Sequence, residues 1–350
     1  MLLSAAIGHK KFEFCMSLAH SYATSAPKGT VIFVVGPTGA GKSTLRKQLT
    51  KSLYGDRSTW QKNEVPLVSV SSSNPESGYF SSKDFFTRLL GALGDPFRGD
   101  QSQPATSDPM LNDELKLFFG EAFWSSIRIC NTEMKIRRAF ERLSVAYGVK
   151  AILIDEAQSM CLLQRNRSPS DHLNSLKCLA EEIGVLIYLF GTYDLLEIWN
   201  HSQQLNRRTR LIHIERYNAE IAADRLEFFS ILKQLGRCLP LEDGKILSAN
   251  ANYILQITNG VFGEVEALLE RARDYAAAVK SVSVTFEHIK LSIYSPSQLQ
   301  RLKYEIDVGE ARIAGKSLRD TKPSRSSENR ASPKSMPGRR NPKRDPCGEP

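Results

Sequence analysis

Apolar and polar residues follow two alternating patterns along the first two thirds of the chain. Short apolar runs, typical of buried strands, are separated by longer stretches in which apolar residues recur with helical spacing. The short runs cover residues 30–35, 65–71, 149–154, 185–190 and 211–214. The helical stretches cover residues 45–49, 83–90, 135–147 and about 171–182. This alternation predicts an α/β fold with a five-stranded parallel sheet and helices on both of its faces.

From residue 219 onward the pattern is helical only, over residues 219–236, 246–257, 263–280 and 285–292. The change predicts a domain boundary near residue 217. We expect an α/β domain over residues 1–217, a small helical lid over 218–295, and a linker with a disordered basic tail over 296–350. Residues 95–110 are rich in Pro, Gly, Ser and Asp, and are predicted to form a loop.

A glycine-rich motif, GPTGAGKST, lies between the first apolar run and the first helical stretch. In such a strand–loop–helix context, glycines let backbone N–H groups converge on phosphates, and the new helix adds its positive N-terminal end. Lys42 is expected to reach the β- and γ-phosphates of ATP, and the Ser43 hydroxyl to bind Mg²⁺. The predicted nucleotide-binding residues are Gly36, Pro37, Thr38, Gly39, Ala40, Gly41, Lys42, Ser43 and Thr44.

The third apolar run ends in two carboxylates, Asp155 and Glu156. Beside a phosphate loop, Asp155 is expected to hold the Mg²⁺ through water, and Glu156 to orient and deprotonate the attacking water. The pair alone is a weak signal, because many buried strands end in an acid. Gln158 either touches the same water network or is an exposed helix residue.

Two further elements follow the fourth apolar run. Thr192 faces the γ-phosphate if its strand lies between the other two site strands; otherwise it belongs to an ordinary turn. Arg207 and Arg208 precede the fifth run. One of them is expected to reach a neighbouring subunit's nucleotide and neutralise charge on the γ-phosphate. A solvated basic turn and a DNA-phosphate contact are the alternatives.

The 350 residues are 41% hydrophobic and carry a net charge of +9, enough chain for two domains with substantial cores. Most of the charge lies in residues 311–350, where eleven Lys or Arg and four Asp or Glu give +7. This basic segment either contacts nucleic acid or an acidic partner, or serves as a solubilising extension. No run is long enough to span a membrane, and no signal peptide is expected. The six scattered cysteines indicate reduced thiols of a cytosolic protein.

Taken in order, these elements resemble the AAA+ ATPases over about residues 10–292. Within that superfamily the sequence is most similar to the TnsC/TniB/MuB group of DNA-transposition regulators. The resemblance rests on GPTGAGKST, on GVKAILIDEAQ at 148–158, on GVLIYLFGTYDL at 184–195 and on QLNRR at 204–208.

This resemblance implies a slow, DNA-stimulated ATPase that oligomerises on duplex DNA as a ring or helical filament. It implies partners as well: a target-selection protein and a transposase, which the oligomer would link. One departure stands out. Many AAA+ proteins place an arginine just after a turn like Thr258–Gly260, whereas the next arginine of the lid helix here is Arg271. Either Arg271 substitutes for that sensor or the sensor is missing.

Candidate DNA contacts are Arg165 and Arg167, after the Asp–Glu strand, and then Lys83 and Arg88. Each of them is equally compatible with a plain solvated surface. Two alternative functions stay open: a loader or remodeller in DNA replication, and a nucleotide-switched signalling NTPase.

Overall fold

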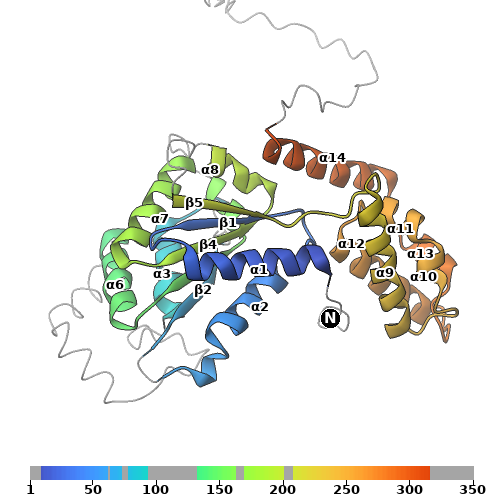
Figure 1. Ribbon diagram of the computed structural model, residues 1–350, viewed down its shortest axis with the longest axis horizontal. Helices are drawn as coiled ribbons and strands as arrows, with labels where there is room; N and C mark the ends of the chain where they lie inside the picture. Colours follow the sequence, from blue (N-terminus) through green and yellow to red (C-terminus); the bar gives the residue numbers. More distant parts are fainter. Residues whose placement is uncertain are drawn as a thin grey trace, which may run out of the picture.

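The structure, a computed structural model, describes residues 9–61, 64–72, 78–93, 132–162, 169–200 and 208–315. Two parts lie side by side: a sheet with its covering helices, and a group of helices formed by the C-terminal part of the chain (Figure 1). The last described helix, α14, runs back from the second part toward the first.

The sheet has five parallel strands in the order β2-β3-β4-β1-β5. The predicted fold class is therefore confirmed, with strand ends that differ from the predicted ones by no more than two residues. The strands are β1 Val31–Val35, β2 Leu67–Ser71, β3 Ala151–Asp155, β4 Leu186–Gly191 and β5 Thr209–His213.

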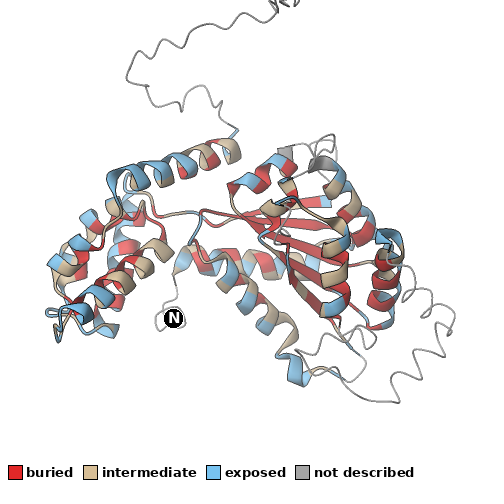
Figure 2. Cartoon of the chain, turned by 180° about the vertical axis from the view of Figure 1, so that it is seen from behind, coloured by how far each residue is buried: buried red, intermediate tan, exposed pale blue. Residues whose placement is uncertain are grey.

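Both faces of the sheet are buried, which explains why its strands are continuous apolar runs. Alternate residues of β1 point to opposite cores: Ile32 and Val34 pack with α1 and α2, whereas Val31 and Phe33 pack with α3, α6 and α7. Figure 2 shows the buried residues concentrated in the strands and on the inward faces of the helices. These helices are α1 Lys10–Ser25, α2 Lys42–Tyr54, α3 Ser82–Ala92, α6 Glu133–Ala146 and α7 Pro169–Ile183, and a short α8 Leu196–Asn200 precedes β5.

The C-terminal helices form a separate apolar core that includes Phe228, Leu232 and Leu268. The segment expected as one helix over 246–257 is divided at Asn250, which ends α10 and begins α11. The helices are α9 Ala222–Cys238, α10 Ile246–Ala249, α11 Ala251–Ile257, α12 Phe262–Ala278 and α13 Phe286–Leu291. The predicted boundary at residue 217 falls between β5 and α9.

One expectation is wrong: residues 296–313, assigned to a linker, form the helix α14, Pro296–Ile313. Pro296 occupies its first position, where a missing N–H costs nothing, and the Gln298 side chain accepts the Ser295 N–H at 3.0 Å. Ile306 is fully buried, and Leu302 packs on the core of the sheet part. The expected loop at 95–110 and the expected tail after residue 315 lie outside the described residues.

Candidate nucleotide-binding site

The glycine-rich loop connects β1 to α2 at the carboxyl edge of the sheet. Gly39 and Gly41 have φ angles of 79° and 87°, a left-handed conformation that side chains disfavour. Gly36 is required for a different reason, because a Cβ there would lie 2.7 Å from the carbonyl oxygen of Ile214. The backbone is thus shaped as a cradle that ends at the N-terminus of α2, where a phosphate would meet free N–H groups.

Lys42 folds back over this loop. Its Nζ donates to the carbonyl oxygens of Gly36, at 2.9 Å, and Pro37, at 2.7 Å. Burial lowers the pKa of Lys42 to about 8, while Glu156 and, less strongly, Asp155 favour its charged form. A phosphate placed in the cradle would add the compensating charge that the buried ammonium lacks.

Ser43 and Asp155 meet across the site, as expected of two ligands to one Mg²⁺. The Ser43 Oγ donates to the Asp155 Oδ2 at 3.3 Å. A hydroxyl and a carboxylate are the hard oxygen donors that Mg²⁺ prefers, so the pair fits the ion. The same Oδ2 lies 3.0 Å from the Nε of Arg46, whose NH1 donates to the Ser69 Oγ at 2.5 Å. Arg46 therefore fixes the carboxylate from the side of α2.

Glu156 follows β3 and adopts a left-handed conformation, with φ at 53°. The hydroxyl of Ser72 donates to its carbonyl oxygen at 2.7 Å, which holds the main chain of this turn. Thr192 follows β4, the strand between β1 and β3. The strand order is thus the one under which Thr192 was expected to face the phosphates. Its hydroxyl lies 3.4 Å from the Asp194 carboxylate.

The predicted arginine pair is only partly described. Arg207 lies outside the described residues. Arg208 directly precedes β5 at the edge of the sheet and forms an ion pair with Glu181 of α7. Its side chain is about half exposed, with 52% of its surface accessible.

The C-terminal helices meet the phosphate loop through main-chain atoms. The N–H of Gly263, in the first turn of α12, donates to the Gly39 carbonyl oxygen at 2.9 Å. A Cβ on Gly263 would lie 2.3 Å from that oxygen, so only glycine permits this approach.

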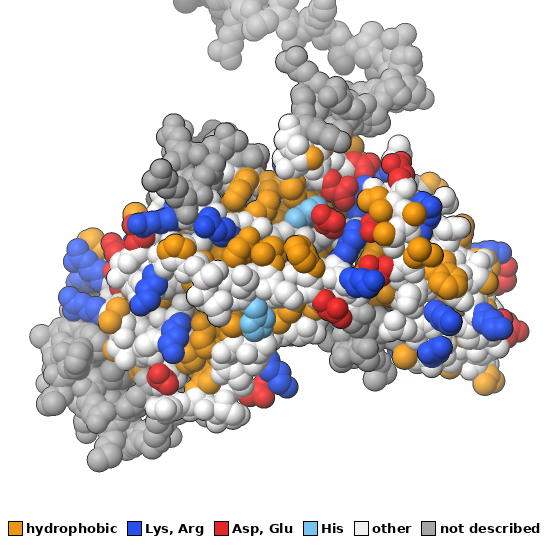
Figure 3. Space-filling model, in the orientation of Figure 1, with side chains coloured by type: hydrophobic (Ala, Val, Ile, Leu, Met, Phe, Trp, Pro, Cys, Tyr) orange, Lys and Arg blue, Asp and Glu red, His pale blue; other side chains and the backbone are white. Residues whose placement is uncertain are grey.

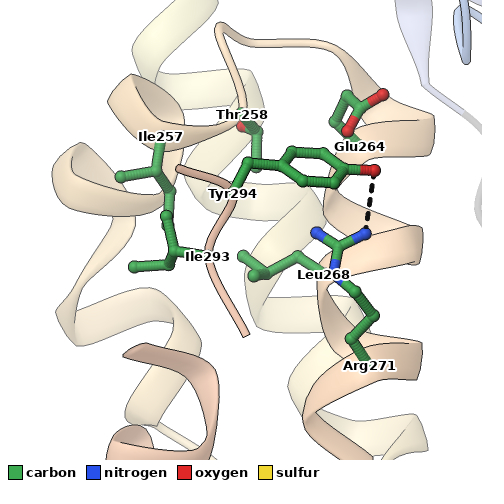
Figure 4. Close-up of a pocket in the computed structure, with 7 residues that line it drawn as sticks. All are labelled: Ile257, Thr258, Glu264, Leu268, Arg271, Ile293 and Tyr294. Carbon is green, nitrogen blue, oxygen red and sulfur yellow. Dashed lines mark hydrogen bonds between the residues drawn. The ribbon is translucent and has the colours of Figure 1, made fainter. Parts of the chain in front are cut away.

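Arg271 faces another direction (Figure 4). Its Nε donates to the Ser292 carbonyl oxygen at 2.9 Å, and its NH1 to the Tyr294 hydroxyl at 3.0 Å. The guanidinium lies 4.1 Å from the centre of the Tyr294 ring. Arg271 is nine residues beyond the start of α12, about 13 Å along the helix. The cavity beside it has a volume of about 10 Å³, which leaves room for roughly one water. Arg271 thus stabilises the lid internally in this conformation.

The structure describes two of the four DNA candidates, and both lie on α3. Arg165 and Arg167 lie outside the described residues. Lys83 is exposed on α3, and the Arg88 Nε pairs with the Asp84 carboxylate at 2.8 Å. On the face seen in Figure 3, Lys and Arg side chains are spread out with Asp and Glu between them.

Comparison with known proteins bears on the fold. Residues 27–199 match a family described as AAA domain. The fold is that of the P-loop AAA+ ATPases. The ADP form of the ORC2 protein of Aeropyrum pernix is similar with a TM-score of 0.52 and 16% identity, over 80% of this chain and 67% of that one.

Two other solved structures share the AAA+ fold at a similar level. A Walker-type ATPase of Pyrococcus abyssi has a TM-score of 0.51 and 12% identity, over 90% of this chain and 79% of that one. Drosophila ORC bound to DNA has a TM-score of 0.50 and 11% identity, over 91% and 78%. No curated protein matches the sequence. Identities this low support the fold and nothing finer.

Three residues of this candidate site were not anticipated from the sequence. Arg46 follows Ser43 by three positions on α2, a spacing that places both on one helix face. Ser72 and Gly263 carry no such local signal, because their partners come from distant segments. In the ranges that the structure describes, every helix is too short or too polar to cross a membrane.

Proposed function

We propose that this AAA+ chain is an ATP-dependent, DNA-binding regulator of DNA transposition. It would oligomerise on duplex DNA, contact the backbone without reading sequence, and couple target-site selection to the transposase. The observation that carries the nucleotide part is the meeting of Lys42, Ser43, Asp155 and Glu156 at the edge where β4 presents Thr192. Three segments distant in sequence thus converge on one edge of the sheet.

The proposed chemistry is hydrolysis of ATP to ADP and phosphate. Loop N–H groups and Lys42 would hold the phosphates, and Ser43 and Asp155 would hold Mg²⁺, which neutralises phosphate charge when bound. Glu156 would accept a proton from a water molecule as the water oxygen bonds to the γ-phosphorus. The bond from that phosphorus to the bridging oxygen breaks, and ADP leaves with the electron pair.

We assign Thr192 to contact with the γ-phosphate, and Arg207 or Arg208 to a neighbour's nucleotide. The second assignment is supported by position: β5 is an edge strand, so the residues just before it are available to another subunit. Arg208 would have to exchange Glu181 for the phosphate. Both partners of this pair are about half exposed, so the exchange would cost little free energy.

The transposition role is supported by the similarity of the motifs at 148–158, 184–195 and 204–208 to the TnsC/TniB/MuB group. The proposal keeps the division into an α/β domain over 1–217 and a lid over 218–295. Its partners are duplex DNA, a target-selection protein and a transposase. Fold likeness to ORC does not favour replication loading over it, because the identities are too low to carry function.

Imaging tests the assembly directly. The full chain should form rings or filaments on linear duplex DNA by electron microscopy with ATP and lose them with ADP. Lys42→Ala should abolish ATP binding and assembly, and Glu156→Gln should bind ATP and assemble but not turn over. Monomers under all conditions would contradict the assembly proposal.

Stimulated helicase or clamp loading, without an effect on target choice in a transposition assay, would favour the replication alternative. An ATPase rate indifferent to DNA would favour the signalling alternative.

The basic tail requires a deletion that spares α14. Removal of residues 316–350 begins after the helix and its terminal Gly315. We expect weaker binding to DNA or transposase and a shallower salt dependence. Unaltered binding at every salt concentration would return the tail to the role of a solubilising extension.

A further inference from the structure

The side chain of Gln158 bridges the two strand ends that flank the site. It belongs to a short 3-10 helix, Ala157–Cys161, that follows Glu156. Its Nε2 donates to the Glu156 Oε2 at 2.5 Å, and its Oε1 accepts the backbone N–H of Thr192 at 3.2 Å. One amide thus links the end of β3 to the end of β4.

The chemistry of the two partners determines the orientation of this amide. An ionised carboxylate only accepts hydrogen bonds, and a backbone N–H only donates them. The NH2 group must therefore face Glu156 and the oxygen must face Thr192. Neither a carboxylic acid in its ionised form nor an alkyl side chain could satisfy both partners.

Gly191 provides the space for this bridge. A Cβ on Gly191 would lie 2.7 Å from the Gln158 Oε1 and 3.1 Å from a methyl carbon of Leu195. Its φ lies outside the left-handed region, so the backbone conformation does not itself demand glycine. The absence of a side chain at 191 is explained by the amide that packs there.

The main chain of Glu156 is anchored separately. Ser72, which is buried, donates its hydroxyl to the Glu156 carbonyl oxygen, and the Ser72 N–H donates to the Asp155 carbonyl oxygen at 2.9 Å. These bonds fix the turn but leave the carboxylate free to rotate. Among the described contacts of the exposed Glu156 carboxylate, the hydrogen bond from Gln158 is the one that orients it.

We propose that Gln158 is a positioning residue for hydrolysis. It holds the Glu156 carboxylate in the orientation that accepts the proton of the attacking water. Through Thr192 it ties that orientation to the strand end that meets the γ-phosphate. The inference rests on the proposed ATPase function and concerns how its general base is controlled. A displacement of the Thr192 backbone by a third phosphate would be passed to Glu156 through a single side chain.

Gln158→Glu is the sharpest test, since it keeps the size of the side chain and the acceptor for the Thr192 N–H. The one change is that the NH2 group that donates to Glu156 becomes an oxygen of a second carboxylate. We expect kcat to fall by about 10- to 100-fold, the effect of losing a hydrogen bond to a charged group. The KM for ATP and the calorimetric ATP affinity should stay within about twofold of the wild-type values. The urea unfolding midpoint should be unchanged. Gln48→Glu, the same substitution on the exposed face of α2, is the matched control and should leave kcat unaltered.

Gly191→Ala tests the bridge without altering Gln158, because the added methyl group displaces the amide. It should lower kcat in the same way while ATP binding persists. If Gln158→Glu retains the wild-type kcat, the positioning role is wrong and the amide merely fills space. A rise in kcat would also overturn it, because the amide would then restrain the base. Glu156→Gln distinguishes a failure of the proposed ATPase mechanism from a failure of the Gln158 proposal. If that variant hydrolyses ATP at the full rate, Glu156 is not the general base, whatever the effect of changing Gln158.

Discussion

Gly309 lets α14 pack against the residue that follows Thr192. A Cβ on Gly309 would lie 2.1 Å from the Cγ of Tyr193 and 2.4 Å from both Cδ atoms. The ring is buried, with 3% of the residue exposed, and its hydroxyl lies 3.0 Å from the His213 Nε2. The ring therefore has no space into which it can move when a methyl group is added.

The expected effect of Gly309→Ala is the balance of two opposing terms. Alanine favours a helix interior by about 1 kcal/mol relative to glycine. Carbon atoms in contact prefer about 3.5 Å, so the helix or the ring must shift by about 1.4 Å. Such overpacking costs about 1–3 kcal/mol. The same shift weakens the contacts of Arg216 with Asp307, at 2.7 Å, and Glu310, at 2.9 Å. The steric term is at least as large as the helical one, and with the weakened ion pairs we expect a net loss of up to about 2 kcal/mol in the free energy of unfolding.

Urea unfolding measures this balance, and hydrogen exchange of the α14 amides locates it. Gly91→Ala is the matched control, because Gly91 is an exposed helical glycine whose added Cβ would meet nothing within 4 Å. That control should gain up to about 1 kcal/mol. If Gly309→Ala is stabilised as much as Gly91→Ala, α14 does not pack on Tyr193 in the way described.

Three further predictions concern the lid and the response to pH. Gly263→Ala would place a methyl group 2.3 Å from the Gly39 carbonyl oxygen. Calorimetry should therefore show ATP bound about 2- to 10-fold more weakly, as expected for one lost hydrogen bond. An unchanged ATP affinity would argue against the contact. Arg271→Gln should leave that affinity unchanged while lowering lid stability, and a large loss of affinity would make Arg271 a nucleotide contact after all. Burial lowers the pKa of His9 and of His213 below the ordinary 6.5. The unfolded chain therefore takes up protons first, and the free energy of unfolding should fall as the pH is lowered from about 7 to 5.5. Urea titrations should show a smaller fall when both histidines are replaced by glutamine.

Much of the fold was predictable because its signals are local. A strand buried on both faces is an apolar run, and each of the five runs forms a strand of the sheet. The helix α14 was missed because its first turn, Pro296–Leu299, is rich in residues typical of linkers. Its apolar positions, Leu302, Ile306 and Ile313, do recur with helical spacing, but they are sparse. The first helix, Lys10–Ser25, was also not predicted.

The candidate site likewise combines features with a local sequence signal and contacts that join distant segments. The phosphate loop could be identified from the sequence because a strand, a turn and a helix start are adjacent in the chain. The contact of Arg46 with Asp155 and the bridge from Gln158 to Thr192 could not, since each joins segments that only the strand order brings together. Gln158 was left undecided for that reason. Its partner Thr192, just after β4, is 34 residues away.

The contact between Gly263 and Gly39 bears on how ATP would be distinguished from ADP. Two glycines that touch through an amide and a carbonyl carry no net charge, and the residue after Gly263 is the acid Glu264. An uncharged contact of this kind would respond to the shape of a bound nucleotide and would gain little from a third phosphate. Under the proposed function, discrimination of ATP from ADP would then depend on Thr192, Gln158 and a neighbour's arginine. Each chain would need a second copy beside it to register which nucleotide it holds.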